Sequence, residues 1–315
     1  MKKNSKGRFN LEGDADELLD RAYESEDEAE VEALVERALE LEPDNPEALL
    51  LRADLTDDDE ERLSILRGAL EAVRVVLKDM EVAPEEFAED ELGLVYLALL
   101  QRAAFTFFSV GEDEEALHAA EELLRYDLED NGASRNLYYR ILVEKGEWQR
   151  ILDETEQDVD HQLGWAYSRL AAAFMSDSCA EGRAVAARMF WDAVIMSPNV
   201  PFYMLGYFPE PEGEAEAEDF NFATLYADVW NASRDLLNWF SRGVILFGLL
   251  SGRFGEESDN MLEILSSLGG RAEYDKMSAV IMDSDDAAII ETLAAHHCLA
   301  AGGAEEEENH EKRTQ

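Results

Sequence analysis

The chain of 315 residues is poor in several residue types, and each shortage excludes a class of protein. Its two cysteines, Cys179 and Cys298, lie far apart with no pairing pattern, which excludes a disulfide framework and favours a reducing compartment. Only 27 basic residues stand against 72 acidic ones, and the net charge of −45 repels nucleic acids and anionic membranes. The longest apolar run, 244–250, is far shorter than the roughly 20 residues of a membrane span. We therefore expect a cytoplasmic protein with no nucleic-acid partner and no membrane span.

The acidic excess itself has two interpretations. It is typical of the proteome of a salt-adapted organism, in which solvated carboxylates keep proteins in solution, and this is the interpretation that we favour. The alternative is an acidic face that serves one function. A hydrophobic fraction of 46% is that of a folded protein, which excludes a disordered acidic chain.

Proline is also rare, with seven in the chain and none between residues 85 and 197. Three segments share offsets of four, three and five: Ala186, Phe190, Ala193 and Pro198; Val31, Val35, Ala38 and Pro43; and Ala116, Ala120, Leu123 and Leu128. Offsets of four and three place side chains on one helical face, and a proline beyond them ends the helix. A helix that recurs with its stop implies stacked units. Because no alternation of the strand type occurs, the sequence predicts an all-α protein.

These patterns predict five parts of the chain. They are a disordered N-terminal tail (1–15), a helical repeat domain (16–208), an acidic linker (209–219), a C-terminal helical region (220–300) and a disordered acidic tail (301–315). Within the repeat domain, we expect Thr56 or Asp57 to cap the helix that follows it, because their side chains can accept from the first backbone amides.

Residues 92–206 carry a more specific pattern. Ala104, Phe107, Gly111, Ala116 and Ala120 fall in order across one unit, and Tyr139, Leu142, Gly146, Trp148 and Ile151 do so in the next. This order resembles the tetratricopeptide-repeat (TPR) superfamily, whose units of about 34 residues form a helix–turn–helix. The resemblance implies an α-solenoid of antiparallel helix pairs with a C-terminal helical extension, and a concave groove that binds a peptide or helix of another protein.

A narrower resemblance covers residues 185–245. Here AVAARMFWDAVIMSPNVPFYMLGYF is followed by ATLYADVWNASRDLLNWF, which is similar to a segment of the suppressor-of-tumorigenicity protein family and its bacterial relatives. The match includes Val200, Pro201, Tyr203 and Leu205, whereas Pro198 and Asn199 stand in reversed order. This resemblance brings no catalytic residues with it.

In a groove of the TPR type, the first helices of the best units would expose six residues. They are Gln101, Phe105, Phe108, Asn136, Arg140 and Val143. Aromatic rings suit apolar side chains of a peptide, an amide suits its backbone and a guanidinium suits a carboxylate. The alternative for Phe105 and Phe108 is that they pack between helices.

The search for chemistry gives weaker signals. His296, His297, Cys298 and His310 suggest a metal site, but adjacent residues on a helix point about 100° apart and rarely bind one ion together. Cys179 has no histidine close to it in sequence, and no glycine-rich phosphate loop occurs.

We therefore expect a non-enzymatic scaffold that binds another protein, with no catalytic, cofactor-binding or metal-binding residues. The alternative is an enzyme or metalloprotein with its site in the C-terminal helical region. A third interpretation is a homo-oligomer formed through residues 220–250. The aromatic residues in that segment, which are Tyr226, Trp230, Trp239 and Phe240, are spaced for a buried helical face.

Overall fold

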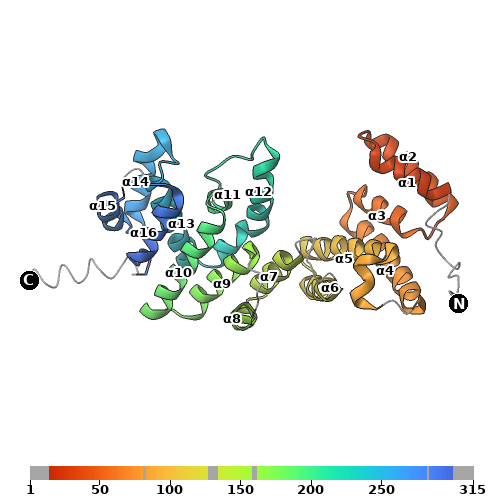
Figure 1. Cartoon of the computed structure of the whole chain (residues 1–315), viewed down its shortest axis with the longest axis horizontal. Helices are drawn as coiled ribbons and strands as arrows, with labels where there is room; N and C mark the ends of the chain where they lie inside the picture. The colour runs from red at the N-terminus through yellow and green to blue at the C-terminus, as the bar shows by residue number, and fades with distance from the viewer. Residues whose placement is uncertain (1–13, 81–82, 127–133, 158–161, 282–283, 301–315) are drawn as a thin grey trace, which may run out of the picture. The chain divides into compact units, whose positions relative to one another are not determined.

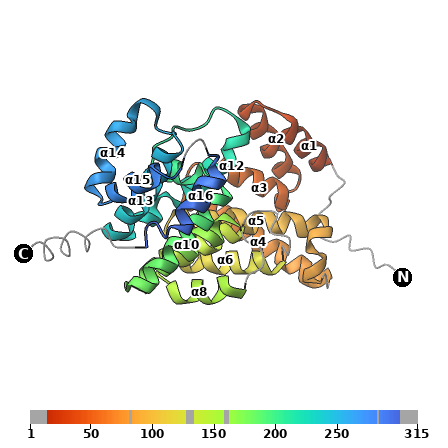
Figure 2. The same cartoon turned by 60° about the vertical axis from the view of Figure 1, so that its left-hand side comes forward.

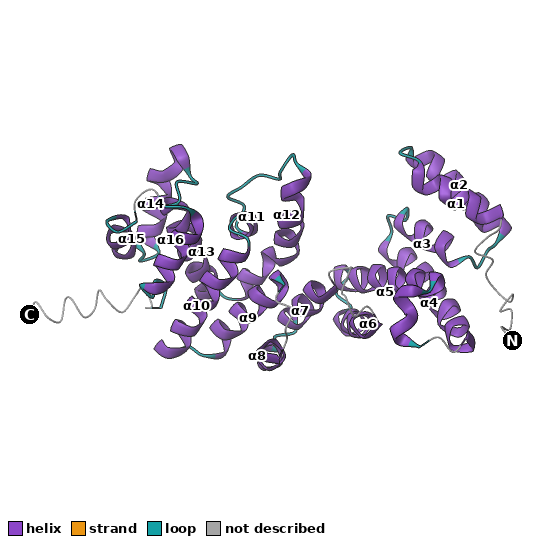
Figure 3. Cartoon of the chain, viewed as in Figure 1, coloured by secondary structure: helices purple, strands orange, loops and turns teal. Residues whose placement is uncertain are grey.

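The structure is a computed structural model that describes residues 14–80, 83–126, 134–157, 162–281 and 284–300. These residues form helices joined by loops, with no strand among them (Figure 3). The prediction of an all-α protein is therefore confirmed. The predicted C-terminal tail and nearly all of the predicted N-terminal tail lie outside the described residues.

The chain divides into two compact units, Met1–Ile141 and Leu142–Gln315. The division falls within the helix Ser134–Glu144, inside the range 16–208 for which the sequence predicts one repeat domain.

The first unit is a succession of helices that pack on their neighbours in sequence. It contains α1 (Asp14–Glu24), α2 (Glu28–Leu41), α3 (Pro46–Asp54), α4 (Asp59–Met80), the 3-10 helix η1 (Pro84–Glu89), α5 (Glu91–Ser109), α6 (Asp113–Tyr126) and most of α7 (Ser134–Glu144). α1 packs on α2, α3 on α4 and α5 on α6, while α2 also contacts α3 and α4 contacts α5. α4, α5 and α6 accordingly lie side by side (Figure 2).

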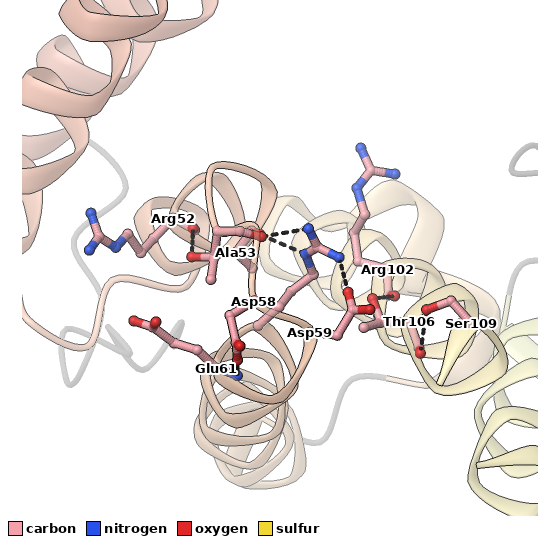
Figure 4. Close-up of polar contacts among 10 residues, drawn as sticks. Arg52, Ala53, Asp58, Asp59, Glu61, Arg102, Thr106 and Ser109 are labelled. Carbon is pink, nitrogen blue, oxygen red and sulfur yellow. Dashed lines mark hydrogen bonds and ion pairs between the residues drawn. The ribbon is translucent and has the colours of Figure 1, made fainter. Parts of the chain in front are cut away.

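The turn between α3 and α4 is set by side chains that bind backbone groups (Figure 4). Asp58 Oδ1 accepts the backbone N–H of Glu61 at 2.8 Å and so caps α4. The hydroxyl of Thr56 instead donates to the carbonyl of Arg52 at 2.7 Å, at the end of α3. The prediction that Thr56 or Asp57 caps α4 is therefore wrong, because the Thr56 side chain already binds the preceding helix.

α5 is the central helix of the first unit. α4, α6, η1 and α3 all pack against it. Among the described helices, α5 alone is long and apolar enough to cross a membrane by length and composition, and 56% of that stretch is buried in the protein. Core helices of water-soluble proteins pass the same test of length and composition.

The second unit contains the remaining helices. They are the end of α7, α8 (Trp148–Gln157), α9 (Leu163–Ser176), α10 (Ala180–Met196), α11 (Val200–Met204), α12 (Glu214–Tyr226), η2 (Ala227–Ala232), α13 (Arg234–Leu250), η3 (Gly255–Glu257), α14 (Ser258–Ser267), α15 (Arg271–Ser278) and α16 (Asp286–Ala295). α9 packs on α10, and α16 packs on both α10 and α13 (Figure 1). α12 begins inside the predicted acidic linker 209–219, since alanine and glutamate are good helix formers even where they bury little.

The core of the second unit is aromatic. The rings of Trp230 and Phe240 stack with 3.6 Å between their centroids, and both side chains are buried. Tyr226 and Trp239 are buried as well, which confirms that these four aromatic residues are buried. They lie on three elements, α12, η2 and α13, and not on one helical face.

The residues that follow α16 are held against this core. The indole N–H of Trp191 donates to the carbonyl of Cys298 at 3.3 Å, and that of Trp239 donates to the carbonyl of Leu299 at 3.0 Å. The backbone N–H of Leu299 donates to Glu273 Oε1 at 2.8 Å. His297 and Leu299 in this segment have positive φ angles of 53° and 71°. Residues other than glycine rarely adopt this backbone conformation.

Candidate functional site

Three of the predicted groove residues share one face of α5. Gln101, Phe105 and Phe108 follow one another at offsets of four and three, and Phe105 is 37% exposed while the other two are half-buried. Leu94, which is 52% exposed, lies seven residues before Gln101 and extends this face by two turns. The sequence analysis missed Leu94, although the same helical spacing could have found it. The half-buried Ala98 lies between Leu94 and Gln101. The α5 face is hereafter the set Leu94, Ala98, Gln101, Phe105 and Phe108.

The other three predicted groove residues lie on α7. Asn136 is half-buried, whereas Arg140 and Val143 are each 5% exposed. The guanidinium carbon of Arg140 lies 5.1 Å from the centroid of the Phe108 ring, so a residue of α7 contacts the α5 face. The sequence predicts that Arg140 and Val143 are exposed to a partner, and the structure instead buries both, Arg140 against an aromatic ring. That these six residues bind a partner stays a prediction.

A pocket of about 510 Å³ opens between α4, α5 and α6. It is lined by Arg67, Leu70, Glu71, Arg74, Leu100, Phe107, Glu114, Glu115, His118, Ala119 and Glu122. Leu100 and Phe107 belong to α5, but Gln101 follows Leu100 by one residue and is turned from it by about 100° around the helix. The pocket and the α5 face therefore use different sides of the same helix. Sequence reasoning missed this pocket, because it is created by the packing of three helices.

Arg74 joins two walls of the pocket. Its Nε donates to the hydroxyl of Tyr96 at 3.1 Å, and its Nη2 donates to Glu122 Oε2 at 3.0 Å. The hydroxyl of Tyr96 in turn donates to Glu122 Oε1 at 2.5 Å. Burial raises the pKa of the Tyr96 phenol, and the hydrogen bond to the Glu122 carboxylate raises it further. Tyr96 is therefore a neutral donor, and its contacts hold two lining side chains, Arg74 and Glu122, in place.

Arg67, which also lines the pocket, binds a carboxylate as well. Its Nη2 lies 2.7 Å from Glu112 Oε2, and its guanidinium carbon lies 5.0 Å from the centroid of the Phe107 ring. The two arginines that line the pocket thus both bind carboxylates of the chain. With four glutamates among the lining residues, the pocket carries excess negative charge and favours a positively charged ligand over an anion.

The histidine and cysteine candidates do not come together as a metal site. Among the described residues, no group of three or more His, Cys, Asp or Glu side chains is placed to hold a metal ion. His296 Nδ1 lies 2.9 Å from the carbonyl of Thr292, one turn back on α16. Cys298 is buried, whereas Cys179 is exposed at the start of α10, and His310 lies outside the described residues.

Comparisons with models of protein families, with curated proteins and with solved structures found no match to this chain.

Proposed function

We propose that this chain is a TPR-like α-solenoid with a C-terminal helical extension, and that it is a cytoplasmic scaffold whose groove binds a peptide or helix of another protein. The repeat part of the proposal is supported by two turns of the same form. Gly111 after α5 and Gly146 after α7 have φ angles of 78° and 68° and lie 35 residues apart, close to the length of one TPR unit.

The hydrogen bonds at these turns also correspond. The backbone N–H of Glu112 donates to the carbonyl of Phe107 at 2.9 Å, and that of Glu147 donates to the carbonyl of Leu142 at 3.0 Å. In both places a glycine in the left-handed conformation follows the end of one helix, and the next helix begins two residues later. Helix pairs of a solenoid need a short connection of this kind. The relation of residues 185–245 to the suppressor-of-tumorigenicity family stays a prediction from the sequence and assigns no activity.

The observation that carries the binding function is the exposed apolar surface of the α5 face. Leu94 and Phe105 are 52% and 37% exposed, although α5 is otherwise the core helix of its unit. Apolar side chains that remain accessible along one side of a helix are the anchors that a partner helix or peptide buries. Because the chain has a net charge of −45, electrostatic steering favours a partner with a basic segment.

Quantitative capture of partners by the full chain tests this proposal. The variant Leu94→Ala with Phe105→Ala removes both anchors, and the loss of about 1–3 kcal/mol for each predicts that partner recovery falls at least about tenfold. The matched control, Ile195→Ala with Val280→Ala, truncates two apolar side chains that are similarly exposed in the second unit. Recovery that is unchanged in the first variant, or lost equally in both, would contradict the proposal.

A further inference from the structure

The surface beside the α5 face is formed by α3 and α1 of the same unit. α3 contacts α5 and lies between α1 and α5 (Figures 1 and 2). Arg102 follows Gln101 on α5, and its Nε lies 2.8 Å from Oδ1 of Asp54 at the end of α3. The charges of Arg102 and Asp54 both act on the pKa of the Tyr23 hydroxyl in α1. Exposed side chains from three helices therefore come together beside the α5 face.

Tyr23 presents an aromatic ring next to a carboxylate. The side chain is 56% exposed, and its hydroxyl donates a hydrogen bond to the carboxylate of Glu47 in α3. Burial raises the pKa of Tyr23 to about 12, and the charge of Glu47 acts in the same direction, so the hydroxyl remains a donor at neutral pH. A lysine or arginine binds an aromatic ring through a cation–π contact and a carboxylate through an ion pair. The two groups together suit a basic side chain.

Further negative charge lies next to Glu47. Burial raises the pKa of Glu47, and the charges of Asp16 and Asp20 in α1 raise it further. These two aspartates are one helical turn apart and so lie on the same side of α1, and Asp20 is exposed. Carboxylates that raise the pKa of a neighbour repel it, and a cation placed among them relieves this repulsion.

We propose that the α5 face binds a basic amphipathic helix of its partner. The apolar side chains of that helix are buried against Leu94 and Phe105, and its lysines or arginines lie against Tyr23, Asp20 and Glu47. Phe105 is one turn from Arg102, whose charge acts on Tyr23, so both contacts are within reach of a helix about 10–12 Å in diameter. The proposal rests on the proposed function, since it names the chemistry of the partner at the same face.

Binding of a synthetic helix to the full chain tests the proposal. The probe carries leucine and phenylalanine on one face and lysine on the other, and fluorescence anisotropy measures its affinity. We expect binding that weakens as salt rises, because screening reduces the attraction between exposed charges. A peptide of the same composition, reordered so that its apolar residues share no face, should bind at least about tenfold more weakly, because it buries less apolar surface. Equal affinity of the two peptides would overturn the proposal.

Two variants with the same change of net charge locate the basic side chains. Asp20→Asn with Glu47→Gln should weaken binding of the amphipathic peptide about fivefold or more, because two ion pairs are lost. The control Glu256→Gln with Asp259→Asn removes two exposed carboxylates of the second unit and should leave the affinity unchanged. Equal weakening by both variants would show that the peptide responds only to the overall charge, and this would overturn the proposal.

Leu94→Ala with Phe105→Ala separates failure of this proposal from failure of the scaffold function. If this variant loses the partner, while the Asp20 and Glu47 variant binds the basic peptide as the control does, the α5 face binds a partner of another chemistry. In that case the scaffold function stands and the basic helix is wrong. If the Leu94 and Phe105 variant retains both its partner and the peptide, the scaffold function fails and this proposal fails with it.

Discussion

The guanidinium of Arg140 in α7 lies over the ring of Phe108 in α5, with 5.1 Å between the guanidinium carbon and the ring centroid. Arg140 is 5% exposed, so this cation–π contact is largely removed from water. Such contacts are worth about 2 kcal/mol when desolvated and about 0.5–1 kcal/mol when exposed. The contact therefore helps to hold α7 against α5.

A double-mutant cycle measures this contact. With Arg140→Met and Phe108→Leu, singly and together, unfolding by urea should give a coupling free energy of about 1–2 kcal/mol. Arg67 and Phe107 form the control pair, because their separation is 5.0 Å but the Arg67 side chain is 53% exposed. A coupling for Arg140 and Phe108 no larger than that of the control pair would contradict this account.

Substitution by alanine should change the stability of the protein in opposite directions at two glycines that have open space around them. Gly111 has a φ of 78°, so Gly111→Ala places a side chain in the left-handed region and should destabilise the protein by about 1 kcal/mol. Gly68 lies inside α4, where Gly68→Ala should stabilise by about 0.5–1 kcal/mol because alanine is the better helix former. Thermal unfolding of both variants checks the pair, and a shift of the same sign in both would refute the backbone argument.

The adjacent histidines after α16 form a second matched pair. His297 has a φ of 53°, whereas His296 has a φ of −90°. His297→Gly should raise the free energy of unfolding by about 0.5–1 kcal/mol, because glycine adopts the left-handed region without steric cost. His296→Gly should give no such gain. Denaturation in urea decides the matter, and equal effects of the two substitutions would show that backbone strain is not the cause.

Cys298 should make stability depend on pH. Burial raises the pKa of its thiol to about 12, and the charge of Glu273 acts in the same direction. A thiol in the unfolded chain has a pKa of about 8.5, so above that pH the unfolded chain loses a proton that the folded chain keeps. The stabilisation is thus complete below about pH 8.5 and is lost as the pH rises towards 12.

The pH dependence of stability can be compared between the wild-type protein and two cysteine variants. Between pH 8 and 10, the wild-type protein should lose about 2 kcal/mol more stability than Cys298→Ala does. Cys179 is exposed, so Cys179→Ala should follow the wild-type pH dependence. If all three proteins lose stability in parallel, the Cys298 thiol is not the titrating group.

Much of the fold could be predicted because helical periodicity is a local property. The sequence places Gln101, Phe105 and Phe108 on the first helix of a unit, and all three lie in α5. Trp230 and Phe240 are buried as predicted, whereas the stacking of their rings is seen only in the structure. The cap of α4 was missed because Thr56, Asp57 and Asp58 are chemically similar, and the choice among them depends on where α3 ends.

Which side chains of each helix are exposed was harder to predict than the position of the helix itself. α5 is apolar on most of its circumference, so periodicity alone cannot decide that Leu94 is exposed while Leu100 lines a pocket. Arg140 is buried because a ring from another helix receives its guanidinium, and a single sequence does not show which ring that is. The pocket lined by Arg67 and Arg74 could not be predicted for the same reason, because it forms only where α4, α5 and α6 pack together.

The central claim is that the α5 face binds a partner, and site-specific photo-cross-linking tests it most directly. A photoreactive amino acid would replace Phe105, which is 37% exposed, and in a second protein Val280, which is 55% exposed in the other unit. The account predicts that irradiation of cells joins a partner protein to position 105 and not to position 280, and that Leu94→Ala lowers the yield at position 105. A partner joined equally at both positions, or joined at position 280 alone, would contradict the account.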